Sequence, residues 1–477
     1  MLYIAAIHIC SLPRMPSFPA VDSVETSAVN ANAPQAERAF TSFDGGVHAN
    51  GMLEQPDRYR YWDRDATQSP RISRGAGLSY AAASFLDGGL TVSHVLFDRV
   101  TGFDTASNIV EVEAGITLFA LHRFLSARGL YLSVQPGHGL ITVGGCIGAD
   151  VHGKNHAHDG TFMSQVEALS LFHPSHGMLE LSRERDPELF RLTCGGYGLT
   201  GHIVRARLRA IPIPSPTVDL RAVAFSDAMD GLERLRGASR EADFAYTWHD
   251  MAGVGKRYGS GYVYQAYFAP GYLESSSLSS ETEPPPLSAA GRAAWPIMIF
   301  NSLSVRALNV LYRYQQRPAL TGRFLPLQDV LFPVHKAQGY FKLFGTRGFH
   351  EYQVILPLAE MPEYLDVIRT YIRQRRLAIT LASAKMFDGP RELLRFTGEG
   401  VCLALNFPRG KVAHEFLPFL DERVMALGGV PNIIKDSRLP RTVVDACYPG
   451  ASEFRTALRS FDPKRMFRSE LSERLGL

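Results

Sequence analysis

The chain has 477 residues, and 50 Lys and Arg against 47 Asp and Glu leave a net charge of +3. This near-balance offers no basic face for nucleic acid, and a hydrophobic content of 45% argues against a mainly disordered chain. Five cysteines without CxxC spacing are too few for a disulfide scaffold, so we expect a reducing, cytoplasmic location.

The beginning of the chain has the features of a mobile tail. Residues 1–10 are apolar but too short to span a bilayer, and no basic segment precedes them, so we expect no secretory signal. Residues 11–40 are rich in Ser, Pro, Ala and Asn without periodicity. We therefore expect a mobile tail over residues 1–40, while peripheral contact with a membrane stays open.

Strands and helices interleave along the rest of the chain. Strand patterns are found at 90–96, 108–114 and 202–211, and helical spacing at 118–128, 295–316 and 362–375. Residues 274–290 combine three successive prolines with many serines, which predicts a long surface loop. The elements follow no regular βαβ order, and this favours an α+β fold.

The first of three glycine-rich segments is SRGAGLSY at residues 73–80. Gly75 and Gly77 would let backbone N–H groups approach an anion, and Arg74 and Ser79 would add donors. Taken alone, the segment is equally compatible with a plain tight turn.

The second segment is PGHGLITVGGCIGADVHGKNH at residues 136–156. Several close approaches of the backbone to a large ligand explain its six glycines better than one turn does. His152, His156 and His158 raise the alternative of a metal site. The glycines oppose a helix there, and no acidic residue or thiol completes a familiar ligand spacing, so we expect no metal.

The third segment, CGGYGLTG at residues 194–201, contains GxGxxG literally. A Rossmann site requires a helix immediately after this motif. The strand pattern at 202–211 follows instead. We therefore expect no nicotinamide site.

In this order and spacing, the three segments resemble the vanillyl-alcohol-oxidase type, or PCMH-type, FAD-binding fold. The HGKNH sequence at 152–156 is more specific and is similar to the decaprenylphosphoryl-β-D-ribose 2′-oxidase family. Further segments that match this family are FNSLSVRALNVLY at 300–312, GTRGFHEYQVILP at 345–357, ALNFP at 404–408, KDSR at 435–438 and the tail from Phe461. The resemblance covers nearly the whole chain from about residue 41.

The resemblance implies an α+β fold with a two-part FAD-binding domain, residues 41–213 and 416–477. A substrate domain built on an antiparallel sheet, residues 214–415, would be inserted between the parts. FAD would be bound non-covalently, since Leu78-Ser79 lacks the histidine to which many relatives attach the flavin. By motif match, the cofactor-binding residues are Arg74, Gly75, Gly77, Ser79, Tyr80, Gly137, Thr142, Gly144, Gly145, Cys146, Gly148, Asp150, His152, Gly153, Asn155, Gly201 and Ile203.

The chemistry that the resemblance implies is oxidation of a sugar secondary alcohol to a ketone by hydride transfer to flavin N5. The implied substrate is the 2′-hydroxyl of a polyprenylphosphoryl-ribose. A short-chain reductase partner would complete its epimerisation to arabinose, for cell-wall arabinan. Such an enzyme would be cytoplasmic or peripheral at the inner membrane.

Specific side chains follow from the same resemblance. Lys435, Tyr80 and His152 are candidates to receive the hydroxyl proton. Lys435 has two alternative roles, which are to stabilise the reduced flavin or to pair with Asp436 or another carboxylate. On the substrate side, the implied residues are Trp248, Gln353, Lys385 and Lys435.

Two departures from the family keep other interpretations open. Glu351 stands where the family often has Gln, and its charge would repel a phosphate. A soluble aldose, aldonolactone or 2-hydroxy acid therefore stays open as the substrate. A non-enzymatic flavin- or metal-binding protein is a third, separate interpretation. Ala404, and not Cys402, aligns with the active-site cysteine of mycobacterial members, so we expect Cys402 to be a small buried thiol.

Overall fold

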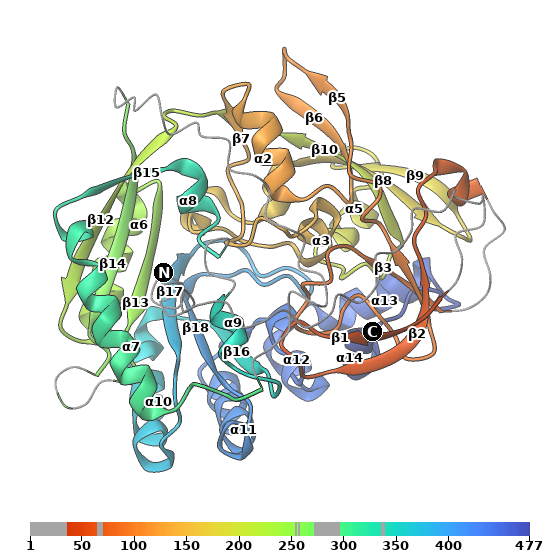
Figure 1. Cartoon of the computed structure of the whole chain (residues 1–477). Coiled ribbons are helices and arrows are strands. Elements are labelled where there is room, and N and C mark those ends of the chain that lie inside the picture. The colour runs from red at the N-terminus through yellow and green to blue at the C-terminus, as the bar shows by residue number, and fades with distance from the viewer. Residues whose placement is uncertain (1–35, 64–69, 253–254, 256–257, 271–295, 335–338) are drawn as a thin grey trace, which may run out of the picture.

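The computed structural model describes residues 36–63, 70–252, 255, 258–270, 296–334 and 339–477 (Figure 1). Within these residues the fold combines helices with four larger sheets and one two-stranded pair, and it is an α+β fold as predicted. The expected loop at 274–290 and most of the expected tail lie outside the described residues. In the described part, no helix is both long and apolar enough to cross a membrane.

Two sheets come from the first 209 residues. The first has the order β1-β2-β4-β3, with strands Ala36–Thr41, His48–Glu54, Leu90–Ser93 and Arg71–Arg74. The second is antiparallel in the order β5-β6-β10-β8-β9, with strands Val100–Asp104, Ile109–Glu113, His202–Arg209, Val166–His173 and Gly177–Ser182. β1 begins inside the expected tail, because residues 36–41 pair in full register with 53–48 of β2.

Two further sheets follow in the central part of the chain. One has the order β13-β14-β12-β15, with strands Phe244–His249, Gly261–Phe268, Thr217–Phe225 and Arg323–Pro326. The other has the order β17-β18-β16-β19, with strands Leu381–Phe387, Gly400–Pro408, Phe349–Leu356 and Val430–Pro431. Both are antiparallel, as expected for the substrate side. A short pair, β7 (Leu130–Tyr131) with β11 (Ile211–Pro212), completes the strands of the described residues.

Several of the helices, such as α2, α6 and α7, begin at a residue whose side chain caps them. The helices are α2 (Leu118–Ser126), α3 (Val143–Ala149), α4 (His156–Asp159), α5 (Pro187–Thr193), α6 (Ala228–Glu241), α7 (Ser302–Gln315), α8 (Leu327–Leu331), α9 (Gly339–Lys342), α10 (Met361–Arg375), α11 (Lys411–Ala426), α12 (Arg441–Cys447), α13 (Ala451–Phe461) and α14 (Glu470–Leu475). α7 starts at Ser302 and not at 295, because the Asn301 side chain accepts the N–H groups of Leu303 and Ser304.

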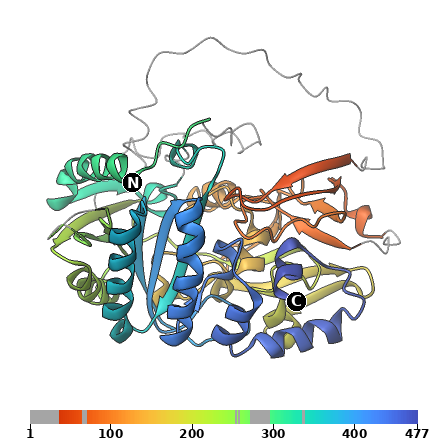
Figure 2. The ribbon, with the colours of Figure 1, turned by 90° about the horizontal axis from the view of Figure 1, so that it is seen from below.

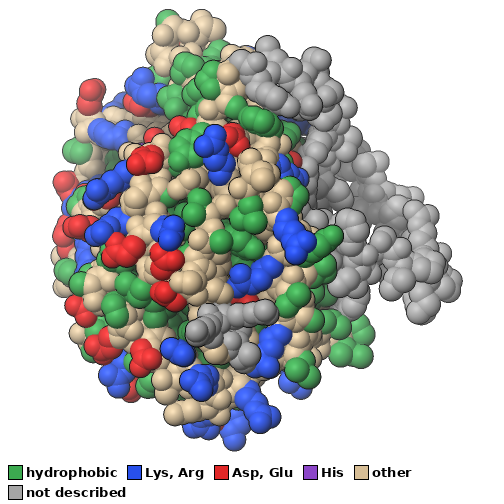
Figure 3. Space-filling model, turned by 90° about the vertical axis from the view of Figure 1, so that its left-hand side faces the viewer, with side chains coloured by type: hydrophobic (Ala, Val, Ile, Leu, Met, Phe, Trp, Pro, Cys, Tyr) green, Lys and Arg blue, Asp and Glu red, His purple; other side chains and the backbone are tan. Residues whose placement is uncertain are grey.

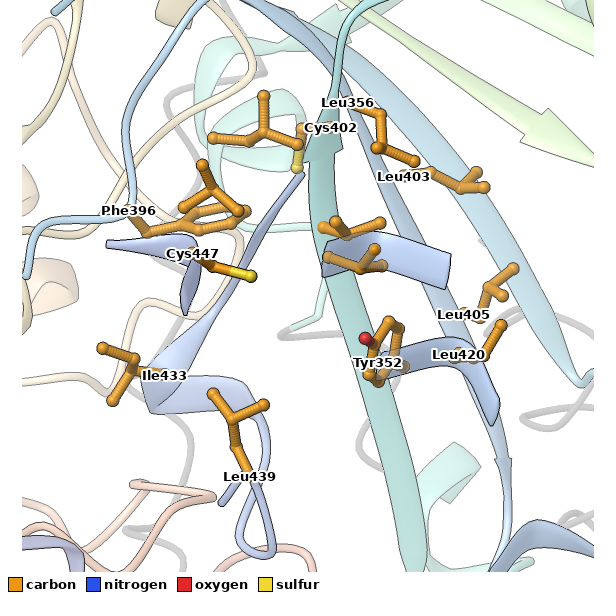
Figure 4. Packing of buried hydrophobic residues seen from close by; sticks show 14 of the residues in the cluster. Tyr352, Leu356, Phe396, Cys402, Leu403, Leu405, Leu420, Ile433, Leu439 and Cys447 are labelled. Carbon is orange, nitrogen blue, oxygen red and sulfur yellow. The ribbon is translucent and has the colours of Figure 1, made fainter. Parts of the chain in front are cut away.

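The largest hydrophobic cluster joins the β17-β18-β16 sheet to the C-terminal helices (Figure 4). Leu403 and Leu405 of β18 and Tyr352 of β16 pack in it with Leu420 of α11. Leu439 and Cys447, from the segment that follows, belong to the same cluster. The sheet and the helices therefore share one core.

The C-terminal segment also returns to the first sheet, as Figure 2 shows by the blue helices beside the orange strands. Arg71 of β3 donates its backbone N–H to Met466 and accepts from Arg468, at 2.8 and 3.0 Å. Glu470 donates to the Phe85 carbonyl at 2.9 Å. These bonds support the predicted two-part domain, whose boundaries at 213 and 415 stay a prediction.

Candidate active site

The three glycine-rich segments meet along one open pocket of about 360 Å³, a volume in the range of ligand sites. The opposite wall comes from β16, β17 and β18 and from the segment around Lys435. Of the predicted cofactor-binding residues, those that line the pocket are Arg74, Gly75, Gly77, Ser79, Tyr80, Gly137, Thr142, Gly144, Gly145, Gly148, Gly201 and Ile203. The three glycine-rich segments thus form one continuous wall of the pocket, which is here termed the glycine bed.

The glycines of this bed are required by close packing. A Cβ on Gly75 would lie 2.1 Å from Oγ1 of Thr142, so the first and second segments touch where both face the pocket. Gly77 has a φ of +70°, a backbone conformation that residues with a side chain rarely adopt. Gly144 packs so closely that its Cβ would be 3.0 Å from that of Ala114. The bed therefore presents backbone to a ligand.

The wall opposite the glycine bed carries the titratable groups. The Lys435 Nζ atom lies 3.3 Å from Oε1 of Glu351 and 4.0 Å from the centre of the Tyr80 ring. Asn406 donates to the other Glu351 oxygen at 3.4 Å. The carboxylate that pairs with Lys435 is Glu351 and not Asp436, which pairs with Arg438 at 2.7 Å. Lys435 and Glu351 both line the pocket, so the ion pair is part of the pocket wall.

Lys385 of β17 and Gln353 of β16 complete this wall. Burial lowers the pKa of the Lys385 ammonium, the Glu351 carboxylate opposes the shift and the Lys435 ammonium adds to it. Gln353 accepts a hydrogen bond at Oε1 from the Asn432 amide at 2.5 Å. Lys435, Tyr80, Gln353 and Lys385 are thus brought together as the sequence suggested, and their roles stay predictions.

Six predicted site residues lie outside the pocket lining, namely Cys146, Asp150, His152, Gly153, Asn155 and Trp248. Asp150 accepts from the Met163 N–H at 2.8 Å and pairs with Arg395 at 3.5 Å. The side-chain amide of Asn155 donates to the Ser133 carbonyl at 2.9 Å. These side chains hold the second glycine segment in shape.

The side chains of His152 and Trp248 pack against aromatic rings and do not line the pocket. The His152 ring packs edge-on against Phe387 with centroids 4.8 Å apart, and burial lowers its pKa well below the ordinary range. Trp248 is 3% exposed and packs against Tyr312 at 4.5 Å. Cys146 is fully buried. In this arrangement Lys435 and Tyr80, and not His152, are placed to reach a pocket ligand.

Several lining residues were missed by the motif analysis, and His94 is the most informative. It lies just after β4, is 3% exposed and lines the pocket, yet its Nδ1 has no hydrogen-bond partner among the described residues. Burial lowers its pKa to about 4, so the ring is neutral. No local pattern marks this histidine, because its position follows from the packing of β4 beside the glycine bed. Asn406, Phe43 and Phe341 also line the pocket.

Cys402 is a buried thiol, as expected. It is 1% exposed on β18, and burial raises its pKa to about 12. Ala404, two residues along the strand, faces the pocket in its place.

The pocket fits an FAD molecule by its own features. The glycine bed has no side chains at positions where a Cβ would clash, so its backbone leaves room for a diphosphate. The Nδ1 atom of buried His94 has no hydrogen-bond partner among the described residues and could bond to a polar group of the cofactor. Arg74, Ser79 and Thr142 would hold the cofactor on this bed, Lys435 would face it from the other wall, and Tyr80 lies at the end of the first glycine segment beside Lys435. Bound FAD supplies the hydride acceptor for oxidation of an alcohol.

Comparisons with known proteins agree with this geometry. Residues 65–182 match a family model described as an FAD binding domain. The chain is 28% identical over 417 residues to decaprenylphosphoryl-beta-D-ribose oxidase of Mycolicibacterium smegmatis, which covers 85% of this chain and 89% of that protein. It is 30% identical to an uncharacterized protein of Streptomyces coelicolor over 76% of this chain and the whole of that protein.

A shorter match joins the chain to a lactone oxidase. It is 33% identical over 139 residues to D-arabinono-1,4-lactone oxidase of Eremothecium gossypii, which covers 29% of this chain and 25% of that protein. The long matches and the flavin motif together exclude the non-enzymatic interpretation. The chain is an FAD-dependent oxidoreductase acting on CH–OH groups, with a PCMH-type FAD-binding domain, and over most of its length it is similar to decaprenylphosphoryl-beta-D-ribose oxidase.

Proposed function

We propose that the enzyme oxidises the 2′-hydroxyl of a polyprenylphosphoryl-ribose to a ketone. The main support for this substrate is the length of the sequence match to the ribose oxidase. The match to the ribose oxidase spans 85% of the chain, whereas that to the lactone oxidase spans 29%. Only the longer match is long enough to include both walls of the pocket.

The cations of the substrate wall support a phosphorylated substrate. Lys385 and Lys435 both line the pocket, and Lys435 is partly neutralised by Glu351 at 3.3 Å. Lys385 is then the cation that binds the phosphate, and Gln353 and Asn406 bind sugar hydroxyls. Because net charge over the chain is only +3, anion recognition rests on such placed groups.

The hydroxyl proton leaves through the Lys435–Glu351 pair as the neighbouring carbon loses its hydride. The Lys435 ammonium passes one proton to the Glu351 carboxylate, 3.3 Å away, and takes up the hydroxyl proton in its place, and the face of the Tyr80 ring stabilises the re-formed ammonium. Phe43 and Phe341 line the same pocket and exclude water from the reacting carbon.

A soluble aldose, aldonolactone or 2-hydroxy acid is the second candidate, favoured by the Glu351 carboxylate in the pocket wall. An anaerobic flavin-bleaching assay separates the two. Polyprenylphosphoryl-ribose should bleach bound flavin at micromolar concentration, with soluble alcohols much weaker. Bleaching by an aldonolactone and none by the lipid-linked ribose would reverse the assignment. We also propose that a short-chain reductase consumes the ketone, which a coupled assay with the partner would detect as arabinose.

A further inference from the structure

We propose that the outer face of helix α7 and the segment after it form a docking surface for an anionic lipid bilayer. This surface, here termed the α7 face, comprises Leu303, Val310, Leu311, Tyr314, Leu320 and Phe324 with Arg306, Arg317 and Arg323. None of these residues lines the pocket.

The apolar side chains of α7 fall on two opposite sides of the helix. Leu303, Val310 and Tyr314 are spaced by seven and four residues, so they form one stripe, and they are 75%, 58% and 64% exposed. Val305 and Tyr312 face the other way and are buried. Because the buried side already anchors the helix, the outer stripe serves no packing within the described residues, and such patches mark interaction surfaces.

The charge of this segment points to the kind of partner. Residues 284–328 contain five arginines, no lysine and no Asp or Glu. Arg313 is partly buried and lies 3.4 Å from Asp250, whereas Arg306, which also donates to the Ala252 carbonyl at 3.0 Å, and Arg317 and Arg323 are exposed. In Figure 3 acidic side chains gather on the left of the view, and the right carries mainly hydrophobic and basic ones.

Basic residues interleaved with exposed apolar ones are the composition of interfacial membrane-binding helices. Tyr314, stacked beneath the Arg317 guanidinium at 4.8 Å, suits the headgroup level, where a ring meets water on one side and acyl chain on the other. A second copy of this chain fits less well. A two-fold contact through this face would set its arginines against one another.

The α7 face also lies on the outside of a pocket wall. Val305 and Leu308 of α7 belong to a hydrophobic cluster that includes Tyr80 and Phe341, and both of these line the pocket. Docking would therefore bring the bilayer close to the pocket. That a lipid-linked sugar enters from this side rests on the proposed function, whereas docking itself does not.

Sedimentation of the full-length, FAD-loaded enzyme with vesicles tests the proposal. We expect binding to phosphatidylglycerol–phosphatidylcholine vesicles, weakened by salt, and little binding to phosphatidylcholine alone. The Arg317→Gln/Arg323→Gln variant should bind about thirtyfold more weakly, the factor expected for two charges at an anionic surface. The variant Leu303→Gln/Val310→Gln/Tyr314→Gln should lose most binding.

Matched variants away from α7 provide the controls. Leu96, Met178 and Met425 are also exposed apolar residues, and their triple Gln variant should bind vesicles normally. The same holds for Arg240→Gln/Arg459→Gln. Retained flavin absorbance reports that each variant is folded.

Three results would overturn the proposal. They are no binding to anionic vesicles, equal loss of binding in the control variants, and unchanged binding of both α7-face variants. A dimer that the α7-face variants split, without vesicle binding, would assign the face to a second copy. Absence of flavin bleaching by the lipid-linked ribose would refute the substrate and leave the vesicle result intact.

Discussion

Lys435 and Glu351 form an ion pair across the substrate wall of the pocket, with 3.3 Å between Nζ and Oε1. Their side chains are 29% and 12% exposed, and the Tyr80 ring covers Lys435 at 4.0 Å. Lys435 follows the short β19 strand, and Glu351 lies on β16. This pair joins the lysine that we propose moves the hydroxyl proton to an acidic residue on β16.

Replacing Lys435 by Met should slow flavin reduction by about 10²- to 10⁴-fold, the range for loss of a positioned acid–base group. FAD content should stay near normal, since the glycine bed is untouched. Stopped-flow absorbance under anaerobic conditions measures the rate. Lys411→Met, at an exposed lysine on α11, is the control, and an equal loss there would contradict the role of Lys435.

Replacing Glu351 by Gln should favour phosphorylated substrates. The loss of one carboxylate beside Lys435 and Lys385 removes a repulsion, and we expect KM for a phosphorylated substrate to fall by about tenfold, or roughly 1.4 kcal/mol. KM for a neutral sugar should change little. Equal changes for both substrates, or a similar effect of exposed Glu363→Gln, would disprove an electrostatic origin.

The lowered pKa of Lys385 predicts a pH dependence of substrate binding. Burial holds this pKa below its ordinary 10.5, so the ammonium is lost at a lower pH than for an exposed lysine. KM for a phosphorylated substrate should therefore rise on the alkaline side. Lys385→Gln should raise KM throughout and abolish this rise, which a KM–pH profile would show. A profile with the same alkaline rise in the variant would assign it to another group.

Lys154 predicts a pH dependence of stability. Its Nζ donates to the Leu331 carbonyl at 3.0 Å, and burial lowers its pKa from 10.5 to about 7. Between these values the unfolded chain binds more protons than the folded one, so the free energy of unfolding rises with pH. The contribution is at most about 1.4 kcal/mol per pH unit. Lys154→Met should flatten this slope in denaturant melts, and exposed Lys464→Met should not.

Gly75 predicts a loss of cofactor affinity on substitution. In Gly75→Ala the new Cβ would lie 2.1 Å from Thr142 Oγ1, so the two glycine segments must separate at an overpacking cost of about 1–3 kcal/mol. Fluorescence titration of the apoprotein should show at least about tenfold weaker FAD binding. Gly237 of α6 has open space around its Cβ position, and Gly237→Ala should leave FAD binding unchanged.

Much of the fold follows from local patterns in the chain. Alternation over 108–114 and 202–211 corresponds to β6 and β10, and the helical spacing at 362–375 corresponds to α10. The three glycine segments can be identified in the sequence because positive φ values and close backbone contacts at these positions require glycine. Gly77 with its φ of +70° is one such position. These are properties that neighbouring residues determine, so the sequence by itself specified them.

The tertiary structure decided which side chains share the pocket. Asp150 and Asn155 belong to the same motif as Gly148, yet their polar groups turn to Arg395 and Ser133 and away from the lining. Lys435 meets Glu351 because β19, which precedes Lys435, pairs with β16, and His94 lines the pocket because β4 lies beside β3, which leads into the first glycine segment. Partners that lie far apart in the chain are chosen by burial and charge in three dimensions, and no local periodicity encodes that choice.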